Sequence, residues 1–236
     1  PNRALGLQLL LDSTLADHFL PELRPLQGCE QPPQWHPEGD VFTHTKIALD
    51  LLPDDAPLEL TLAVLLHDIA KPPTQTFDEA DNRIRFNGHD SLGAEMSEEI
   101  LRRLKFSNAT IEAVREMVAR HMQFMNVQQM RTAKLKRFMS RPTFPLEMEL
   151  HRVDCASSNG FTDNYKFLQA KEQEFANEPL IPPPLVTGKD LIARGIEPSP
   201  RFRIILEEIQ TRQLEKVLTN REQALAHLET LLSETS

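Results

Sequence analysis

A histidine followed directly by an aspartate, His67-Asp68, stands near the end of the most apolar stretch of the sequence. That stretch, Leu60 to Ala70, predicts a helix that is buried on most of its sides. Burying a carboxylate beside an imidazole costs several kcal/mol unless a counter-charge compensates for it. A divalent cation would supply that charge, whereas the alternative is a solvated or hydrogen-bonded pair. The pair is therefore the first candidate for a metal site.

Two further residues could bind the same ion from other predicted helices. His44 belongs to a helix expected over about residues 40–52, which can face the His-Asp pair if the two helices pack antiparallel across the loop at 53–56. Asp154 belongs to a helix expected over about residues 145–158. Divalent first-row metals accept imidazole nitrogen and carboxylate oxygen together. Ligands that arrive singly from separate helices are typical of metal sites inside helical bundles.

His89 and His121 are expected at the ends of two more helices, where the mouth of a site would lie. His89 should begin a helix over residues 89–105, and His121 should end a helix over 109–120 whose N-cap is Ser107. The alternative for each histidine is an exposed imidazole at a helix terminus.

The composition predicts the elements that must position these residues. Glycine is scarce, with 8 of 236 residues, while Leu, Ala, Glu, Arg and Gln recur at spacings of three and four. That pattern favours an all-α fold with almost no strands. Pro72-Pro73 should end the central helix, residues 21–37 should form an irregular loop, and 74–87 should form a short hairpin or a lid-like loop. Further helices are expected near residues 5–15, 163–177, 188–195, 200–218 and 221–232.

The run Pro182-Pro183-Pro184 is the best linker in the sequence, because consecutive prolines are stiff and do not form helix. We therefore expect a metal-binding helical domain over residues 1–178 and, over residues 179–236, the proline-rich linker with a C-terminal helical segment. That segment should pack on the helical body, since isolated short helices are marginal in water.

Charge and composition exclude several classes of protein. The net charge of −9 argues against broad, unspecific nucleic-acid binding by the chain as a whole. No apolar run approaches the roughly 18 residues that span a bilayer, and the first residues lack the apolar stretch of a signal peptide. Cys29 and Cys155 are the only cysteines, and they are expected to be buried thiols. A cytoplasmic protein is expected.

The order of the candidate ligands, His, then His-Asp, then His, His and Asp, resembles the HD superfamily of metal-dependent phosphohydrolases. Several segments look more closely like the HD region and C-terminal part of bacterial tRNA nucleotidyltransferases and poly(A) polymerases. These segments are Glu38–Thr45 (EGDVFTHT), Leu65–Thr74 (LLHDIAKPPT), Phe86–Glu95 (FNGHDSLGAE) and Pro184–Ile192 (PLVTGKDLI).

The resemblance implies a multi-helix HD-domain bundle with a C-terminal helical extension. In that family the HD region follows a nucleotidyltransferase head, whose Gly-Ser motif and paired aspartates this sequence does not contain. We therefore expect the chain to be the C-terminal part of such an enzyme or a stand-alone descendant, and we predict no nucleotidyl transfer by this chain alone. The family points to RNA ends or nucleotides as substrates, and to tRNA as a partner.

The expected activity is hydrolysis of a phosphoester by a metal-dependent phosphodiesterase or phosphatase. One or two divalent ions (Mn, Ni, Co, Fe, Mg or Zn) would lower the pKa of a water molecule and polarise a phosphoryl oxygen. Asp68 would bridge the two ions, and Lys71 could neutralise a phosphate, although a solvated lysine at a helix end is the alternative. The expected metal ligands are His44, His67, Asp68, His89, His121 and Asp154.

Other polar and aromatic residues near these motifs have simpler expectations. Arg131, Lys134 and Arg137 could bind substrate within a basic cluster that also contains Lys136 and Arg141, and a solvated helix face is the alternative. Asp40 and Asp90 should be solvated loop carboxylates rather than groups that orient the ligands. Trp35 and His36 should cap the core rather than stack on a base.

Two other functions stay open at this point. One is a non-catalytic HD module that supports tRNA or RNA binding for a separate or missing nucleotidyltransferase domain, with a metal of structural value only. The other is a nucleotide-sensing or scaffold domain that binds no ion.

Overall fold

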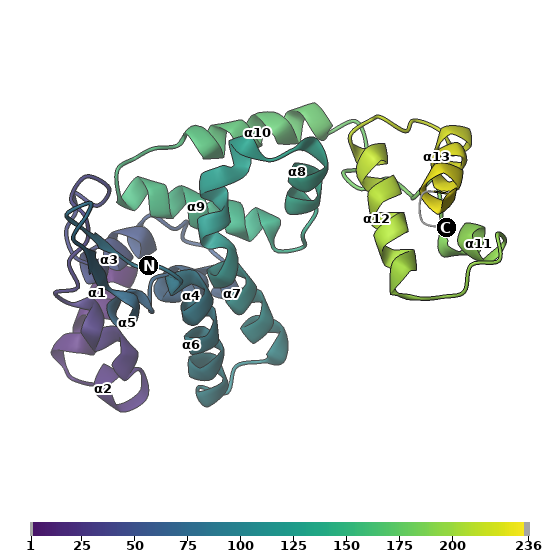
Figure 1. Cartoon of the computed structure of the whole chain (residues 1–236). Helices are drawn as coiled ribbons and strands as arrows, with labels where there is room; N and C mark the ends of the chain where they lie inside the picture. Colours follow the sequence, from purple (N-terminus) through teal and green to yellow (C-terminus); the bar gives the residue numbers. More distant parts are fainter. Residues whose placement is uncertain (1, 234–236) are drawn as a thin grey trace. The chain divides into compact units, whose positions relative to one another are not determined.

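The computed structural model describes residues 2–233, and its elements group into two compact units (Figure 1). The first unit contains the residues up to Asn126 together with Pro142–Gln169, and the second contains Val127–Arg141 together with the residues after Gln169. The second unit thus takes a segment from the middle of the chain. The domain division expected between residues 178 and 179 stays a prediction.

The first unit is helical, as the sequence predicts. Its elements, two of which run on into the second unit, are α1 (Arg3–Asp12), α2 (Ala16–Phe19), the 3₁₀ helix η1 (Pro21–Leu26), α3 (Val41–Asp50), α4 (Leu58–Leu66), α5 (Lys71–Thr74), α6 (His89–Arg103), α7 (Asn108–Arg120), the 3₁₀ helix η2 (His121–Gln129), α9 (Phe144–Ser157) and α10 (Asp163–Phe175). Among the residues described, no helix is both long and apolar enough to cross a membrane.

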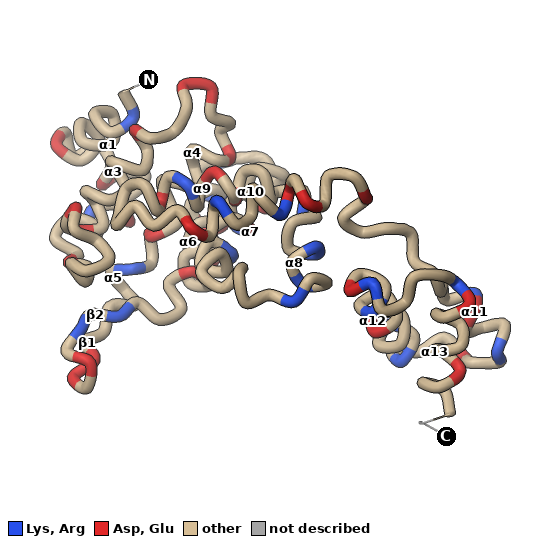
Figure 2. Tube along the Cα trace, turned by 90° about the horizontal axis from the view of Figure 1, so that it is seen from above, with Lys and Arg blue, Asp and Glu red and all other residues tan. Residues whose placement is uncertain are grey.

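One antiparallel hairpin provides all the strand found in residues 2–233. It consists of β1 (Thr76–Asp78) and β2 (Arg83–Arg85), with Phe77 opposite Ile84. In Figure 2 the turn of the hairpin carries acidic residues, while β2 and α5 carry basic ones. The hairpin expected between residues 74 and 87 is confirmed.

The central helix ends earlier than the sequence analysis predicts, at Leu66 instead of Ala70. A proline has no N–H to donate to the carbonyl four residues before it. If α4 continued through residues 67–70, the carbonyls of Asp68 and Ile69 would find no donor at Pro72 and Pro73. The chain instead forms a turn, in which the amide of Lys71 donates to the carbonyl of Asp68, and the two prolines lie in α5. The His-Asp pair consequently lies in a turn between two helices.

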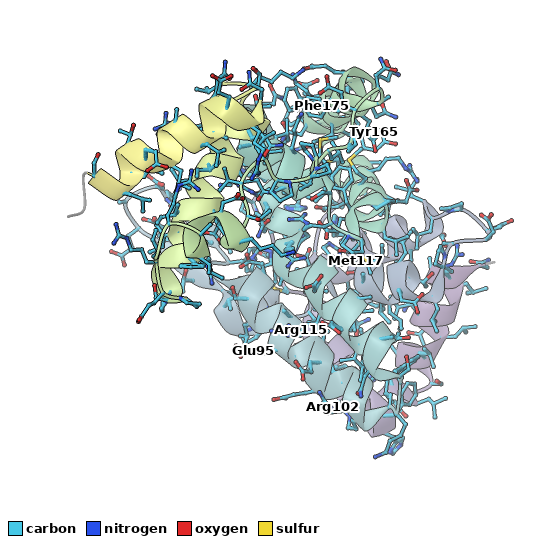
Figure 3. All side chains as sticks on the ribbon, turned by 90° about the vertical axis from the view of Figure 1, so that its right-hand side faces the viewer. Glu95, Arg102, Arg115, Met117, Tyr165 and Phe175 are labelled. Atoms are coloured by element: carbon cyan, nitrogen blue, oxygen red, sulfur yellow. The ribbon has the colours of Figure 1, made fainter. Side chains whose placement is uncertain are left out.

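The core of the first unit lies where α3, α4, α7 and α9 pack together, and α6 packs along α7. Gly93 lets α6 approach the turn after α4 closely, since a Cβ at this position would lie 3.3 Å from Val118 and 3.6 Å from the carbonyl of His67. Arg102 of α6 and Arg115 of α7 are labelled in Figure 3. Glu98 forms ion pairs with both of them.

The second unit has a smaller apolar core of its own, formed mainly by Val186, Leu191, Ile205, Ile209 and Leu228. Its helices are α8 (Thr132–Met139), α11 (Gly188–Ile192), α12 (Pro200–Leu214) and α13 (Arg221–Ser233), with the last part of α10. Within this unit α12 packs against α8, α11 and α13.

Candidate metal centre

Local backbone signals place each of the histidines. Asp40 is the N-cap of α3 and accepts hydrogen bonds from the amides of Gly28 and Thr43, which sets His44 in the first turns of the helix. Gly88, with a positive φ of 79°, precedes α6 and makes His89 its first residue. His121 is the C-cap of α7, whose N-cap is Ser107 as predicted.

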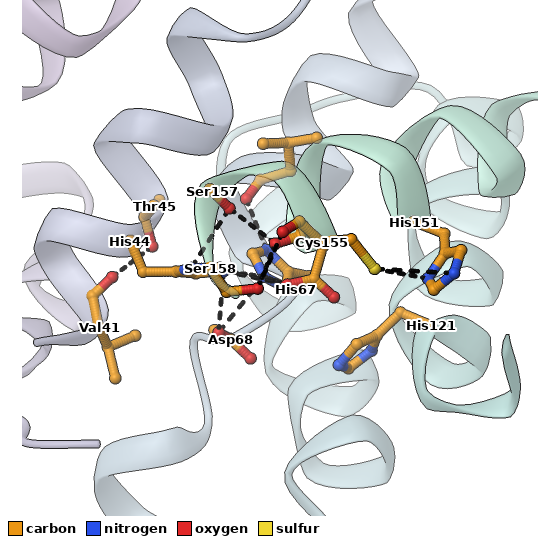
Figure 4. A network of polar contacts seen from close by, with 12 residues as sticks. Val41, His44, Thr45, His67, Asp68, His121, His151, Cys155, Ser157 and Ser158 are labelled. Atoms are coloured by element: carbon orange, nitrogen blue, oxygen red, sulfur yellow. Dashed lines mark hydrogen bonds and ion pairs between the residues drawn. The ribbon is translucent and has the colours of Figure 1, made fainter. Parts of the chain in front are cut away.

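The first group of potential ligands contains residues from three segments of the first unit: α3, the turn after α4, and α9. The Nε2 atom of His44 lies 3.2 Å from that of His67, 3.7 Å from Asp68 Oδ2 and 3.2 Å from Asp154 Oδ1. The Nε2 atom of His67 lies 3.3 Å from Asp68 Oδ2. Figure 4 shows His44, His67 and Asp68 converging between the helices.

The second group shares Asp68 with the first. His89 Nε2 lies 3.6 Å from Asp68 Oδ1 and 3.1 Å from His121 Nε2, so the two oxygens of one carboxylate face two different histidine pairs. Two atoms bound to one ion at about 2.1 Å lie roughly 3 to 4 Å apart. The spacings in both groups fall in that range, and the sets His44–His67–Asp68 and Asp68–His89–His121 could each hold an ion.

The hydrogen bonds of the four rings test whether the donor set fits a cation. The Nδ1 atoms of His67, His89 and His121 lie 2.6 to 2.8 Å from backbone carbonyls, and Nδ1 of His44 lies 2.8 Å from Glu38 Oε1. Since an oxygen acceptor must receive a hydrogen, each Nδ1 is a protonated nitrogen, and each ring in its neutral form would present a lone pair at Nε2. The Nε2 atoms of His44 and His67 face each other, as do those of His89 and His121, and facing lone pairs repel unless a cation lies between them. In their neutral forms the rings would therefore suit a divalent metal.

The carboxylates are held ionised. Burial alone would raise the pKa of Asp68, but the charges of His67 and Lys71 outweigh burial and keep this pKa well below its usual value. Asp68 Oδ2 accepts no well-oriented hydrogen bond from any described residue. Burial also opposes ionisation of Asp154, and its hydrogen bond to His44 lowers the pKa despite that. A carboxylate binds a metal ion through an ionised oxygen that has a free lone pair, and Asp68 Oδ2 meets this requirement.

The imidazoles on the two sides of Asp68 have pKa values shifted in opposite directions. Burial lowers the pKa of His44, but hydrogen bonds to Asp154 and Glu38 more than compensate and raise it to about 9. Burial and the neighbouring charges of His67 and His89 lower the pKa of His121 to about 4.

Lys71 is not the solvated lysine that was the alternative expectation. Its side chain is 7% exposed, its Nζ lies 2.7 Å from Asp68 Oδ2, and it donates to Gln31 Oε1 over 2.6 Å. This buried ammonium lies next to Asp68, and both residues line the same cavity.

The site also includes residues that sequence reasoning missed. Glu38 accepts hydrogen bonds from the Nδ1 atoms of both His36 and His44, and Ser157 Oγ lies 3.3 Å from His44 Nδ1. His151 is buried one turn before Asp154 and contacts Cys155 Sγ. An i, i+3 spacing of His151 and Asp154 on one helix was the available signal, whereas nothing in the sequence distinguishes Glu38 from an exposed loop glutamate.

The basic residues expected to bind substrate belong to the second unit. Arg131 and Lys134 are exposed, at the start of α8 and within it. Arg137 is half-buried and donates to Thr211 over 2.9 Å, and buried Lys136 lies over the ring of Phe175. The cluster is therefore divided between solvated and packed side chains, and its role in binding substrate stays a prediction.

A cavity of about 400 Å³ opens beside the cluster within the first unit. Its lining includes Asp68, Lys71, His89, His121 and Asp154. The rest of its lining comes from the loop around Trp35, from the hairpin, from η2, from α9 and from the segment after α9. Trp35, which was expected to cap the core, is 45% exposed and lines this cavity.

Comparison with known proteins agrees with this geometry. The HD domain family matches residues 36–153, which is half of the chain and ends one residue before Asp154. The chain therefore belongs to the HD domain family.

Among curated proteins, the chain is 34% identical over 236 aligned residues to the A-adding tRNA nucleotidyltransferase of Deinococcus radiodurans, with 94% of this chain and 53% of the relative covered. It is 32% identical to the CC-adding tRNA nucleotidyltransferase of Thermus thermophilus, covering 97% of this chain and 53% of the relative. The Multifunctional CCA protein of Halorhodospira halophila matches 44% of the chain at 38% identity. The chain spans about half the length of the first two relatives.

Proposed function

We propose that this chain is a metal-dependent phosphohydrolase that acts on nucleotides or RNA ends, as a phosphodiesterase or a phosphatase. The observation that carries the proposal is the convergence of four imidazole Nε2 atoms and two carboxylates beside an open cavity. Membership of the HD domain family supports the same chemistry.

Each candidate residue would have a distinct role in this reaction. His44, His67 and Asp154 would hold one ion, His89 and His121 a second, and Asp68 would bridge them. Divalent ions bound there would polarise a phosphoryl oxygen and lower the pKa of a water molecule. Lys71 carries the positive charge that would orient a phosphate oxygen in the cavity.

The test combines metal analysis with a substrate screen. The purified chain is expected to bind a divalent metal and to hydrolyse a generic phosphodiester or phosphomonoester with Mn, Ni, Co or Mg. Replacing His67 and Asp68 together by alanine should abolish hydrolysis and leave the helical content, measured by circular dichroism, unchanged.

The matched control is the double variant Asp17→Ala/His18→Ala. It removes the same two residue types from exposed positions on α2, outside the cluster and the cavity lining. This variant should retain both metal and activity. Full activity in the His67/Asp68 variant would eliminate the proposed mechanism.

The second candidate is a non-catalytic HD module that supports RNA binding for a nucleotidyltransferase domain. It is favoured by the names of the relatives and by the exposed Arg131 and Lys134. Salt-dependent tRNA binding without turnover under any divalent ion would support it, and Arg131→Ala/Lys134→Ala should then weaken binding and reduce its salt dependence.

A further inference from the structure

The lining of the cavity combines the buried charged cluster with exposed apolar side chains, and it also includes Arg83 and Arg85 of the hairpin. Four of the large hydrophobic side chains that the first unit exposes line this one cavity: Trp35, Met122, Met125 and Phe161. Exposing large apolar side chains to water is unfavourable, so their gathering at one cavity indicates a binding surface rather than chance. The cavity thus joins charged groups to exposed apolar surface, which suits a ligand that has both an anionic and an apolar part.

Trp35 is held at the cavity by its own loop. The backbone amides of Trp35 and His36 both donate to the carbonyl of Pro32 over 3.0 Å. The ring of His36 contacts that of His44 edge-on, with 5.1 Å between centroids, and its Nδ1 donates to Glu38. The loop that carries the indole is therefore connected to the candidate ligand His44 and to Glu38. A preorganised flat surface binds its ligand without a large ordering cost.

We propose that Trp35 is a stacking surface for the nucleobase of the substrate, with Phe161 and the two methionines completing the apolar part of the cavity lining. The proposal rests on the proposed function, because it places the phosphate of the same ligand at the cluster. Stacking accepts any base, since every base has a π-face, so the site selects nucleotides over other phosphoesters without selecting one base. Its cavity of about 400 Å³ is in the range of small-molecule sites.

The sole tryptophan of the chain makes binding directly measurable. Adenosine 5'-monophosphate should quench or shift Trp35 fluorescence, whereas ribose 5-phosphate, which carries the same phosphate and no base, should not. Free N-acetyltryptophanamide, treated in the same way, corrects for absorption by the base. An equal response to both ligands, or no response to either, would overturn the proposal.

Two phenylalanines with nearly equal exposure provide a matched pair of variants. Phe161 is 62% exposed and lines the cavity, while Phe77 is 60% exposed and lies outside its lining. Phe161→Ala should weaken the fluorescence response to the nucleotide, and Phe77→Ala should leave it unchanged. An equal effect of the two variants would contradict the assignment.

Kinetics separate this inference from the proposed function. Trp35→Ala should raise the KM for a nucleotide by about 5- to 150-fold and leave that for ribose 5-phosphate unchanged, with Trp35→Phe retaining most of the preference. Hydrolysis of both substrates with unchanged KM in Trp35→Ala would refute stacking and leave the hydrolase assignment intact. Nucleotide-specific quenching without turnover would refute the hydrolase assignment and support the stacking site.

Discussion

His44 and His121 are both fully buried imidazoles on opposite sides of Asp68, and their pKa values move in opposite directions. His44 lies between Glu38 and Asp154, and these carboxylates raise its pKa to about 9 in spite of burial. His121 bonds to a backbone carbonyl and faces another imidazole, and burial lowers its pKa to about 4. Both rings are buried, so the groups that contact each ring account for the opposite directions of the two pKa shifts.

The same contrast describes the two halves of the cluster. The half around His44 contains or contacts three carboxylates, those of Glu38, Asp68 and Asp154. In the half around His121, Asp68 is the one carboxylate among the potential ligands in the described residues. Because negative charge near a site favours a divalent cation, we expect the first half to hold its ion more tightly than the second.

The largest effect should follow removal of the charge that the two halves share. Asp68→Asn keeps the shape of the side chain but leaves Lys71 buried without its counter-charge and both halves without their common ligand. We expect the metal content to fall to near zero and the hydrolysis rate to fall by roughly 10²- to 10³-fold or more. Elemental analysis measures the metal content, and a phosphatase assay measures the hydrolysis rate. Unchanged circular dichroism shows that the variant is folded. Wild-type metal content in this variant would rule out a bridging role.

The contrast between the halves is tested by a matched pair of variants, His44→Gln and His121→Gln. His121→Gln should lose the weaker ion and keep the one bound at the first half, whereas His44→Gln should lose the tighter one. Titration with Mn²⁺, followed by native mass spectrometry, counts the ions that remain. Identical stoichiometry and affinity in the two variants would show that the halves are equivalent.

A smaller effect is expected from Glu38→Gln, which weakens the support of His44 without removing a metal ligand. Loss of such a supporting hydrogen bond typically costs about 10- to 100-fold in metal affinity or activity. Isothermal titration with the metal measures the change. Glu30→Gln, at an exposed position in the same loop region, is the control and should have no effect.

The smallest effect concerns a carboxylate that the protein satisfies by itself. Asp190 accepts from the backbone and hydroxyl of Thr187 and pairs with Arg221, and these contacts lower its pKa to about 2. Asp190→Asn should lower the free energy of unfolding by about 1 kcal/mol and leave metal binding unchanged.

The pH dependence of that contribution has a defined sign. The pKa of Asp190 is lower in the folded chain than its ordinary 3.8, so its stabilisation is complete above pH 4 and is lost as the pH falls towards 2. The difference in melting temperature between wild type and Asp190→Asn should therefore shrink over this interval. A difference that stays constant down to pH 2 would contradict the assignment.

Local patterns predicted much of the fold, because N-caps, glycines and helix ends depend on neighbouring residues. The N-cap Ser107, the start of α6 at His89 and the hairpin before it follow from such patterns. The early end of α4 at Leu66 was missed, since the apolar pattern continues through Ile69 while the backbone does not.

The site was predictable in its ligand types but not in its supporting groups. The six expected ligands are brought together in the structure, and their roles in metal binding stay predictions. Glu38, Gln31 and Ser157 support the cluster through contacts between segments distant in sequence. No local pattern specifies such contacts, because they depend on how loops and helices pack.

The bonds that orient three of the four rings have a further consequence. His67, His89 and His121 each donate from Nδ1 to the carbonyl three residues earlier, in Val64, Phe86 and Val118. The direction of each Nε2 is therefore a property of one four-residue segment, and it travels with that segment when neighbouring helices shift. Substitutions elsewhere in the bundle can then move these ligands as rigid pieces without turning them away from the ion, whereas His44 depends on a distant loop to keep its direction.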